Sequence, residues 1–323
     1  MNKTKYNNFF NLFKNKNNLI AAWNKETNNK PLATIKDNIA TKFLPTMGSS
    51  LLLKDFYPFY NATVIDKLIK NNVDIIAKTH LDEFGMGGTG LFSGYGFIYN
   101  PLDQKRIIGG SSSGSAATFT NDIYLSIASD TGNSIRVPAS YIGIYGFKPS
   151  YGAISRYGLY SYSSSLDTIG FYVHNVKETI EISNIIFDKD QKDMTSQAIE
   201  KPNFDIKKPK SIAYYDVLEL YPNYIQKAFF NLIDQLKNQN IQVNPIKIDI
   251  SLFKHILLTY QIISYVEALS NLSRYSGLVY GNSIEKDNWL DTLIETRSKY
   301  LGFMVQKRLT IISIILNDQT FDY

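Results

Sequence analysis

Three short segments carry the residues whose types and spacing could perform chemistry. Lys36 ends the apolar run LATIK, GSSSG occupies residues 110–114, and DTGNSIR occupies residues 130–136 after another apolar run. A lysine acts as a base only when burial or a cationic setting leaves its amine neutral, and a serine becomes a nucleophile only beside a base. The three segments together therefore raise the possibility of a serine nucleophile served by a lysine.

The GSSSG segment allows two interpretations. It matches Gly-x-Ser-x-Gly, the pattern of a nucleophile elbow, which also needs an acidic residue and a histidine. Only His174 and His255 lie downstream, and neither stands in a suggestive context. The alternative is a Ser/Gly turn at the start of a helix over residues 115–119.

The DTGNSIR segment is also open to two interpretations. Gly132 permits a sharp turn, in which consecutive backbone N–H groups can converge on an anion and form an oxyanion hole. Ser134 would then lie beside its own stabilising donors. The alternative is a plain Asp/Ser turn in which Arg136 forms a salt bridge.

Composition removes several other kinds of site. The chain has no Cys, and its three His are far apart without a paired metal-binding spacing, so disulfides, thiolate chemistry and a metal site are not expected. GGTG at residues 87–90 lacks the ending of a phosphate loop, so no nucleotide cofactor is expected either. Lys36 is the base that remains.

The chain has 323 residues, 20% of them charged, and a net charge of +5, which is too small to indicate a nucleic-acid surface. It is long enough for one large domain or two smaller ones. Lys or Asn interrupts the apolar residues at its start, and no run is long enough to cross a membrane. We expect a cytoplasmic protein.

The hydrophobic pattern predicts alternating strands and helices, and hence an α/β fold. Residues 1–30 suggest a helix followed by a loop, and Ser/Tyr-rich residues 155–170 suggest another loop. A linker is expected near 190–210. Strands are predicted within 31–40, 73–78, 123–130, 141–150, 211–216 and 241–249, helices within 61–70, 115–119, 176–187 and 223–239, a loop over 131–140, and further helices to the end.

The three segments, with GFKP at 146–149, resemble the amidase signature family. KTHLDEFGMGGTG (78–90), SYGAISRYGLYSYSSSLDTIG (150–170) and EALSNLSRYSGLVYG (267–281) are similar to the branch formed by the A subunits of glutamyl-tRNA(Gln)/aspartyl-tRNA(Asn) amidotransferases. The resemblance runs from about residue 31 to residue 323. It implies a central mixed β-sheet covered by helices on both faces and incomplete at the C-terminus, with a catalytic block at 31–175 and a downstream helical, substrate-binding part at 211–323.

The resemblance also implies roles for individual residues. Ser134 would be the nucleophile, Ser111 the serine after a cis peptide that relays its proton, and Lys36 the neutral base. Backbone N–H groups of residues 131–134 (Thr131, Gly132, Asn133, Ser134) would form the oxyanion hole, and Tyr280 would help bind glutamine. No metal or cofactor is implied in this chain.

The implied activity is glutamine hydrolysis, which supplies ammonia to a complex with B and C subunits. ATP and Mg would be used by a partner subunit, and tRNA would be reached only through the complex. Two departures from the family pattern are Asn133 and Ser113, where the family usually has Gly; Asn tolerates positive φ better than most residues. The family also continues beyond Tyr323 with an Arg and an acidic residue that hold the substrate.

Three other functions stay open at this point. The chain could be an amidase that acts on free amides without tRNA, a non-catalytic subunit that only binds partners, or an esterase built on the GSSSG elbow.

Overall fold

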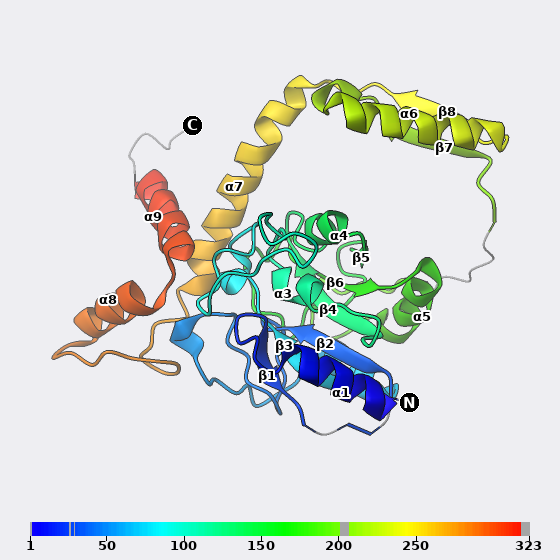
Figure 1. Ribbon diagram of the computed structural model, residues 1–323. Helices are drawn as coiled ribbons and strands as arrows, with labels where there is room; N and C mark the ends of the chain where they lie inside the picture. The colour runs from blue at the N-terminus through cyan, green and yellow to red at the C-terminus, as the bar shows by residue number, and fades with distance from the viewer. Residues whose placement is uncertain (1, 26, 29, 201–206, 318–323) are drawn as a thin grey trace. The chain divides into compact units, whose positions relative to one another are not determined.

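A six-stranded mixed sheet forms the centre of the first of two structural units (Figure 1). The computed structural model describes residues 2–25, 27–28, 30–200 and 207–317. The strands lie in the order β1-β3-β2-β4-β6-β5, with β2 parallel to both neighbours and the other pairs antiparallel. Their bounds are β1 (Ile20–Trp23), β2 (Leu32–Lys36), β3 (Asp74–Thr79), β4 (Leu125–Asp130), β5 (Tyr145–Phe147) and β6 (Thr168–Val173).

Helices cover both faces of this sheet, as expected. Neighbouring residues of one strand enter opposite cores, because successive side chains of a strand point to opposite faces. Ile127 and Phe171 pack with α2 and α5 on one face, and Ala128 and Tyr172 pack with α1, α3 and α4 on the other. These helices are α1 (Asn2–Phe13), α2 (Thr63–Lys70), α3 (Ser113–Ala117), α4 (Arg136–Ile142) and α5 (Val176–Ile186).

The central strands are buried along their whole length. Every residue of β2, β3, β4 and β6 is buried, which is why these segments are near-continuous apolar runs in the sequence. A third core joins the loops after β2 and β3 to the C-terminal helices, with Leu52, Phe84, Leu272 and Val305 at its centre. The remaining elements of this unit are η1 (Leu51–Leu53), η2 (Glu83–Gly85), α8 (Trp289–Tyr300) and α9 (Phe303–Asn317).

The second unit comprises residues 203–262 and the first unit the rest of the chain. In it, β7 (Ser211–Tyr215) pairs in parallel with β8 (Gln242–Ile246), and α6 (Asn223–Asn238) connects the two strands; η3 (Leu218–Leu220) precedes that helix. Helix α7 (Ser251–Leu272) begins in this unit and ends in the first. The boundary falls in the stretch where the sequence suggests a linker, of which residues 201–206 lie outside the described residues.

Three elements differ from the sequence-based predictions. Strand β1 lies in the predicted N-terminal loop, where only Ile20 is buried, so its pattern is weak. Helix α4 occupies the predicted loop at 131–140 and the start of the predicted strand at 141–150; Pro138 hides its helical character, and Asp130 fixes its start. Strand β6 begins inside the predicted loop at 155–170, which Ser and Tyr residues dominate.

Within the described residues, every helix is too short or too polar to cross a membrane.

Candidate active site

Lys36 and Ser129 come together at one edge of the central sheet. Strands β2 and β4 are parallel neighbours, with Ile35 opposite Ile127, so their carboxyl ends meet at the same edge. Such an edge is where α/β sheets usually build binding sites. Lys36 ends β2 and is completely buried, and Ser129 lies near the end of β4.

The Lys36 ammonium nitrogen contacts two serines. Its Nζ lies 2.9 Å from Ser111 Oγ, 2.9 Å from Ser129 Oγ and 3.3 Å from Ser129 O. Burial lowers the pKa of Lys36 from 10.5 to about 7, although the carboxylates of Asp130, Asp82 and Asp167 oppose this shift. Near neutral pH a large fraction of Lys36 is therefore the neutral amine that a base requires.

Ser111 follows a tightly constrained glycine. The peptide bond between Gly110 and Ser111 is cis, as the resemblance implies. A Cβ on Gly110 would lie 2.1 Å from Asp82 Oδ2 and 3.0 Å from Thr89 N, so only glycine fits. Asp82 is held in turn by N–H groups of the 89–92 loop, including that of Phe92 at 2.9 Å. This packing fixes the position from which Ser111 reaches Lys36.

The loop after β4 is held by the buried carboxylate of Asp130. Its Oδ2 accepts from Ile135 N at 2.9 Å and from Arg136 Nε at 3.2 Å, and its Oδ1 accepts from Arg136 Nη2 at 2.9 Å. The salt bridge of the alternative interpretation thus exists and shapes the loop. Within the described chain, the N–H groups of residues 131–134 have no acceptor, which is the state that an oxyanion hole needs.

Ser134 lies in this loop and is buried. Its carbonyl oxygen accepts from Ser112 N at 3.2 Å, and this bond connects the loop that carries Ser134 to the GSSSG segment. Among the described residues, no hydrogen bond joins the Ser134 hydroxyl to Ser111 or Lys36. The structure therefore brings Lys36 and Ser111 into contact and places Ser134 beside them through the main chain. Asn133 does not adopt positive φ, so its tolerance of that conformation is not used here.

The elbow interpretation finds no support in the geometry. Ser112, the central serine of the GSSSG pattern, donates its hydroxyl to Ser129 O at 3.0 Å. His174 instead bonds the carbonyl oxygen of Ile123 at 2.7 Å and stacks on Phe119. The third histidine, His80, is buried and pairs with Ser49 at 2.8 Å.

Tyr280 lines an aromatic pocket of about 340 Å³. Its hydroxyl donates to the carbonyl oxygen of Arg274 at 3.1 Å. Neither the two serines nor the lysine of the predicted site lines this pocket. The pocket wall nevertheless touches the strand end that carries Lys36, because Tyr160 N donates to Asn38 O at 2.8 Å. The pocket residues are Phe56, Tyr57, Pro58, Phe59, Tyr60, Leu159, Tyr160, Arg274, Tyr275 and Tyr280.

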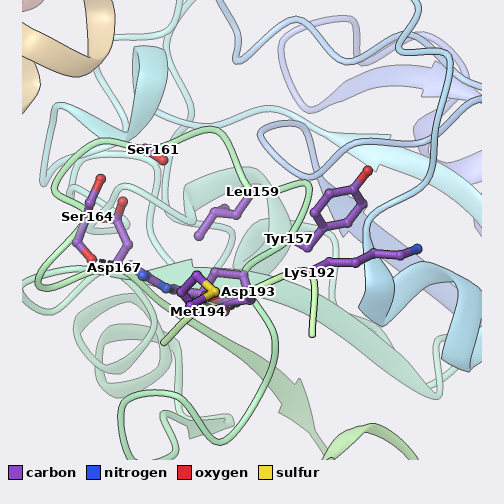
Figure 2. A pocket seen from close by; sticks show the side chains of 9 residues that line it. Tyr157, Leu159, Ser161, Ser164, Asp167, Lys192, Asp193 and Met194 are labelled. Atoms are coloured by element: carbon purple, nitrogen blue, oxygen red, sulfur yellow. Dashed lines mark hydrogen bonds and ion pairs between the residues drawn. The ribbon is translucent and has the colours of Figure 1, made fainter. Parts of the chain in front are cut away.

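A second, polar pocket of about 200 Å³ is lined by residues of the segments 156–167 and 192–194 (Figure 2). Asp167 forms part of its wall and accepts the Thr131 hydroxyl at 2.6 Å, together with the N–H groups of Tyr162 and Ser163. Burial raises the pKa of Asp167 to about 6. Figure 2 shows Asp167 close to Ser164 in this wall. Asp167 therefore anchors the first residue of the predicted oxyanion hole.

The sequence does not predict the contacts of three residues of this site, namely Ser129, Asn38 and Asp167. Ser129 and Asn38 stand inside the motifs that reveal the site, but nothing in the motif letters shows that both face Lys36 or its partners. Asp167 likewise belongs to a family-like segment, but its bond to Thr131 spans 36 residues of sequence.

Comparison with known proteins agrees with this architecture. The chain is 38% identical over 308 residues to the A subunit of glutamyl-tRNA(Gln) amidotransferase from Mycoplasma genitalium, a match that covers 91% of this chain and 64% of the relative. It is 37% identical over 320 residues to the protein of the same name from Sulfolobus acidocaldarius, covering 94% and 67%. The chain thus spans less than two thirds of the Mycoplasma relative's length.

Solved structures show the same fold. The crystal structure of the A subunit of glutamyl-tRNA(Gln) amidotransferase from Thermotoga maritima matches with a TM-score of 0.76 and 24% identity, over 96% of this chain and 74% of that one. Peptide amidase from Stenotrophomonas maltophilia matches with a TM-score of 0.80 and 21% identity, over 97% and 72%.

The family model named Amidase matches residues 3–323, a range that begins well before residue 31, where the sequence motifs place the start of the resemblance. Strand β1, which pairs with β3, lies in this additional part. A match over nearly the whole chain, together with the mixed sheet and the Lys36–Ser111 contact, shows that the chain belongs to the amidase family.

Proposed function

We propose that this chain hydrolyses glutamine as the A subunit of a tRNA-dependent amidotransferase. The observation that carries the proposal is the buried Lys36 in contact with Ser111, next to a loop whose N–H groups are unpaired in the described chain. The similarity of the chain to subunits of that name supports the choice of substrate. Tyr280, in the aromatic pocket, is proposed to help bind glutamine.

The proposed chemistry starts with proton transfer. Lys36 takes the Ser111 hydroxyl proton while Ser111 takes that of Ser134, and the Ser134 oxygen attacks the side-chain carbonyl carbon of glutamine. The carbonyl oxygen becomes an oxyanion that accepts from N–H groups of residues 131–134. When the C–N bond breaks, the proton returns through Ser111 to the leaving nitrogen, which departs as ammonia. Water then cleaves the ester to glutamate and free Ser134.

The ammonia released from glutamine must be passed to a second substrate that accepts it. In the proposed complex, B and C subunits bind this chain, and a partner uses ATP and Mg to activate the glutamate on Glu-tRNA(Gln), which ammonia converts to Gln-tRNA(Gln). tRNA would contact the partners, not this chain. Translation takes place in the cytoplasm, which is where we propose that the chain acts.

The test is glutamine hydrolysis by the chain assembled with B and C subunits. Ser134→Ala should abolish glutamate release because no ester can form, whereas Ser111→Ala should leave a residual rate. Ser298→Ala, an exposed serine on α8, is the matched control and should keep the wild-type rate. Wild-type turnover by Ser134→Ala would overturn the proposed nucleophile.

The same assembly separates the alternatives. Hydrolysis of simple amides but not of glutamine would indicate a tRNA-independent amidase. Stable binding to the partners without any hydrolysis would indicate a non-catalytic subunit.

A further inference from the structure

Asn38 carries a buried oxygen that nothing in the described structure satisfies. The side chain is only 3% exposed, and its Nδ2 donates to Ser129 Oγ at 3.0 Å, but its Oδ1 has no hydrogen-bond partner. A buried acceptor without a donor costs free energy that folded proteins usually avoid. Asn38 lies two residues after Lys36 in the sequence, and its side chain contacts Ser129, which also contacts Lys36. The unpaired oxygen therefore belongs to a side chain one contact away from the proposed base.

The contacts of Lys36 match its protonated form. An ammonium has three N–H donors, and Nζ has three oxygen neighbours: Ser111 Oγ, Ser129 Oγ and Ser129 O. A neutral amine has two N–H donors and one lone pair. One of the two hydroxyls must therefore turn from acceptor to donor when Lys36 loses its proton.

The two hydroxyls compete for the single lone pair. If Ser111 donates to Lys36, the base faces the relay that leads to Ser134. If Ser129 donates instead, its hydroxyl occupies the lone pair, and Lys36 cannot accept the proton of Ser111. With Asn38 Nδ2 facing Ser129, the Ser129 proton has no acceptor other than Lys36 among the described residues.

An Asn side chain can reverse this preference, because rotation of the amide by half a turn exchanges oxygen and nitrogen at nearly the same positions. We propose that Asn38 turns its unpaired Oδ1 towards Ser129 when Lys36 is neutral, accepts the Ser129 hydroxyl proton, and thereby directs the Lys36 lone pair to Ser111. Ser129 keeps one bond to Asn38 in either orientation, so the protonation state of Lys36 selects between them. Asn38 and Ser129 are then positioning residues for the base.

This inference rests on the roles proposed for Lys36, Ser111 and Ser134, but not on glutamine as the substrate. A fluorophosphonate probe that labels an activated serine reports the nucleophile without any amide substrate. Labelling of Ser134 in a complex that does not hydrolyse glutamine would leave this inference intact and reject only the substrate. Absence of labelling in the wild-type chain would reject the assigned roles and this inference with them.

The experiment is the labelling rate of Ser134 against pH in wild type, Asn38→Ala, Ser129→Ala and the double variant. The charged groups facing Lys36 are the carboxylates of Asp130, Asp82 and Asp167, so the profiles are compared above the range in which Asp167 titrates, about pH 6. Asn38→Ala should lower the plateau rate roughly five- to tenfold, the worth of one net hydrogen bond. In the Ser129→Ala background the same substitution should have no further effect, because the competing hydroxyl is gone. An equal loss in both backgrounds would overturn the proposal.

Asn38→Asp provides a second test, in which the new side chain has the same size as Asn and leaves no cavity. Its carboxylate is of the same shape and still accepts the Ser129 proton, so the plateau should be kept. Its negative charge favours the Lys36 ammonium, so the midpoint should move to higher pH. Loss of the plateau in Asn38→Asp would contradict the proposal. Asn100→Ala, which removes another buried Asn with its own main-chain partners, is the control and should leave the profile unchanged.

Discussion

Two buried lysines on neighbouring strands have different surroundings. Lys36 ends β2 and Lys78 lies on β3, where it is the register partner of Ile35, and both are completely buried. Lys36 contacts two serine hydroxyls and a carbonyl. Lys78 donates to the carbonyl oxygen of Ile39 and to Thr46 Oγ1 at 2.9 Å, both in the loop that follows β2. The hydroxyls that contact Lys36 belong to Ser111 and Ser129. The partners of Lys78, a carbonyl and a threonine hydroxyl, belong to the loop that follows β2.

Burial lowers the pKa of Lys36 to about 7 and that of Lys78 to about 8. Nearby carboxylates oppose both shifts, and for Lys78 the carboxylate is that of Asp37. Asp37 is itself fixed by the N–H groups of Met47 and Ser49, each at 3.1 Å. Lys78 therefore holds the loop that follows β2, and Lys36 is the lysine proposed as the base. Burial alone therefore does not distinguish the two lysines; the residues that each one contacts do.

The largest expected effect is on the rate after substitution of Lys36. Lys36→Ala should lower Ser134 labelling and glutamine hydrolysis by roughly 10²–10⁴-fold, the usual contribution of a general base. Lys36→Arg should be as inactive, because a guanidinium does not lose its proton in this range. Lys42→Ala, at an exposed position, is the control. A Lys36→Arg chain with near wild-type rate would mean that the site needs positive charge and not a base.

Lys78 should show the opposite behaviour. Lys78→Met leaves the Ile39 carbonyl and the Thr46 hydroxyl without their donor and removes a charge that lowers the pKa of the buried Asp37, so it should destabilise the fold by about 1–3 kcal/mol. Urea unfolding measures this loss. The fraction that remains folded should still label at Ser134. A stable Lys78→Met chain that no longer labels would place Lys78 in the chemistry and erase the distinction between the two lysines.

The pH dependence of Ser134 acylation tests the proposed base without a substitution. Deprotonation of Lys36 raises the fraction of neutral amine, so the labelling rate should rise with pH, by about tenfold per unit below the midpoint, and level off above it. The midpoint should lie near the pKa of Lys36, about 7, far below its ordinary value of 10.5. A rate that continues to rise towards pH 10 would show that burial does not lower the pKa of Lys36 in the folded chain.

The sequence predicts the parts of this site that depend on local pattern. The apolar runs of β2 and β4 identify buried strands, and the residues at their ends identify Lys36 and the Asp130–Arg136 loop. Helix α4 is not predicted because its start depends on the carboxylate of Asp130 and not on helical periodicity. The start of strand β6 is not predicted because the Ser/Tyr-rich residues before it resemble a loop.

The partners of Lys36 could not be predicted in the same way. The bond between Lys36 and Ser129 joins residues 93 positions apart, and that between Asn38 and Ser129 joins residues 91 positions apart. Only the parallel pairing of β2 and β4 brings them together. Motif letters indicate that these residues matter, but the distribution of donors and acceptors among them requires the three-dimensional structure.

The smallest expected effect is a pH-dependent difference in stability. With a pKa of about 7 in the folded chain and 10.5 when exposed, Lys36 binds fewer protons in the folded state between these values. Stability then rises with pH across this window, by at most about 1.4 kcal/mol per pH unit. Below the window both states are protonated, so Lys36 adds no pH dependence there.

Lys36→Met removes this contribution. The free energy of unfolding of wild type should therefore rise relative to that of Lys36→Met as pH increases from about 7 to about 9. The free energy of unfolding of wild type should also rise relative to that of Lys78→Met, but from a higher pH, because the pKa of Lys78 is lowered only to about 8. Urea unfolding of the three chains at several pH values measures both differences. If the free energies of unfolding of wild type and Lys36→Met change with pH in the same way, Lys36 keeps its proton in the folded chain throughout this range. The two lysines would then differ only in their hydrogen-bond partners.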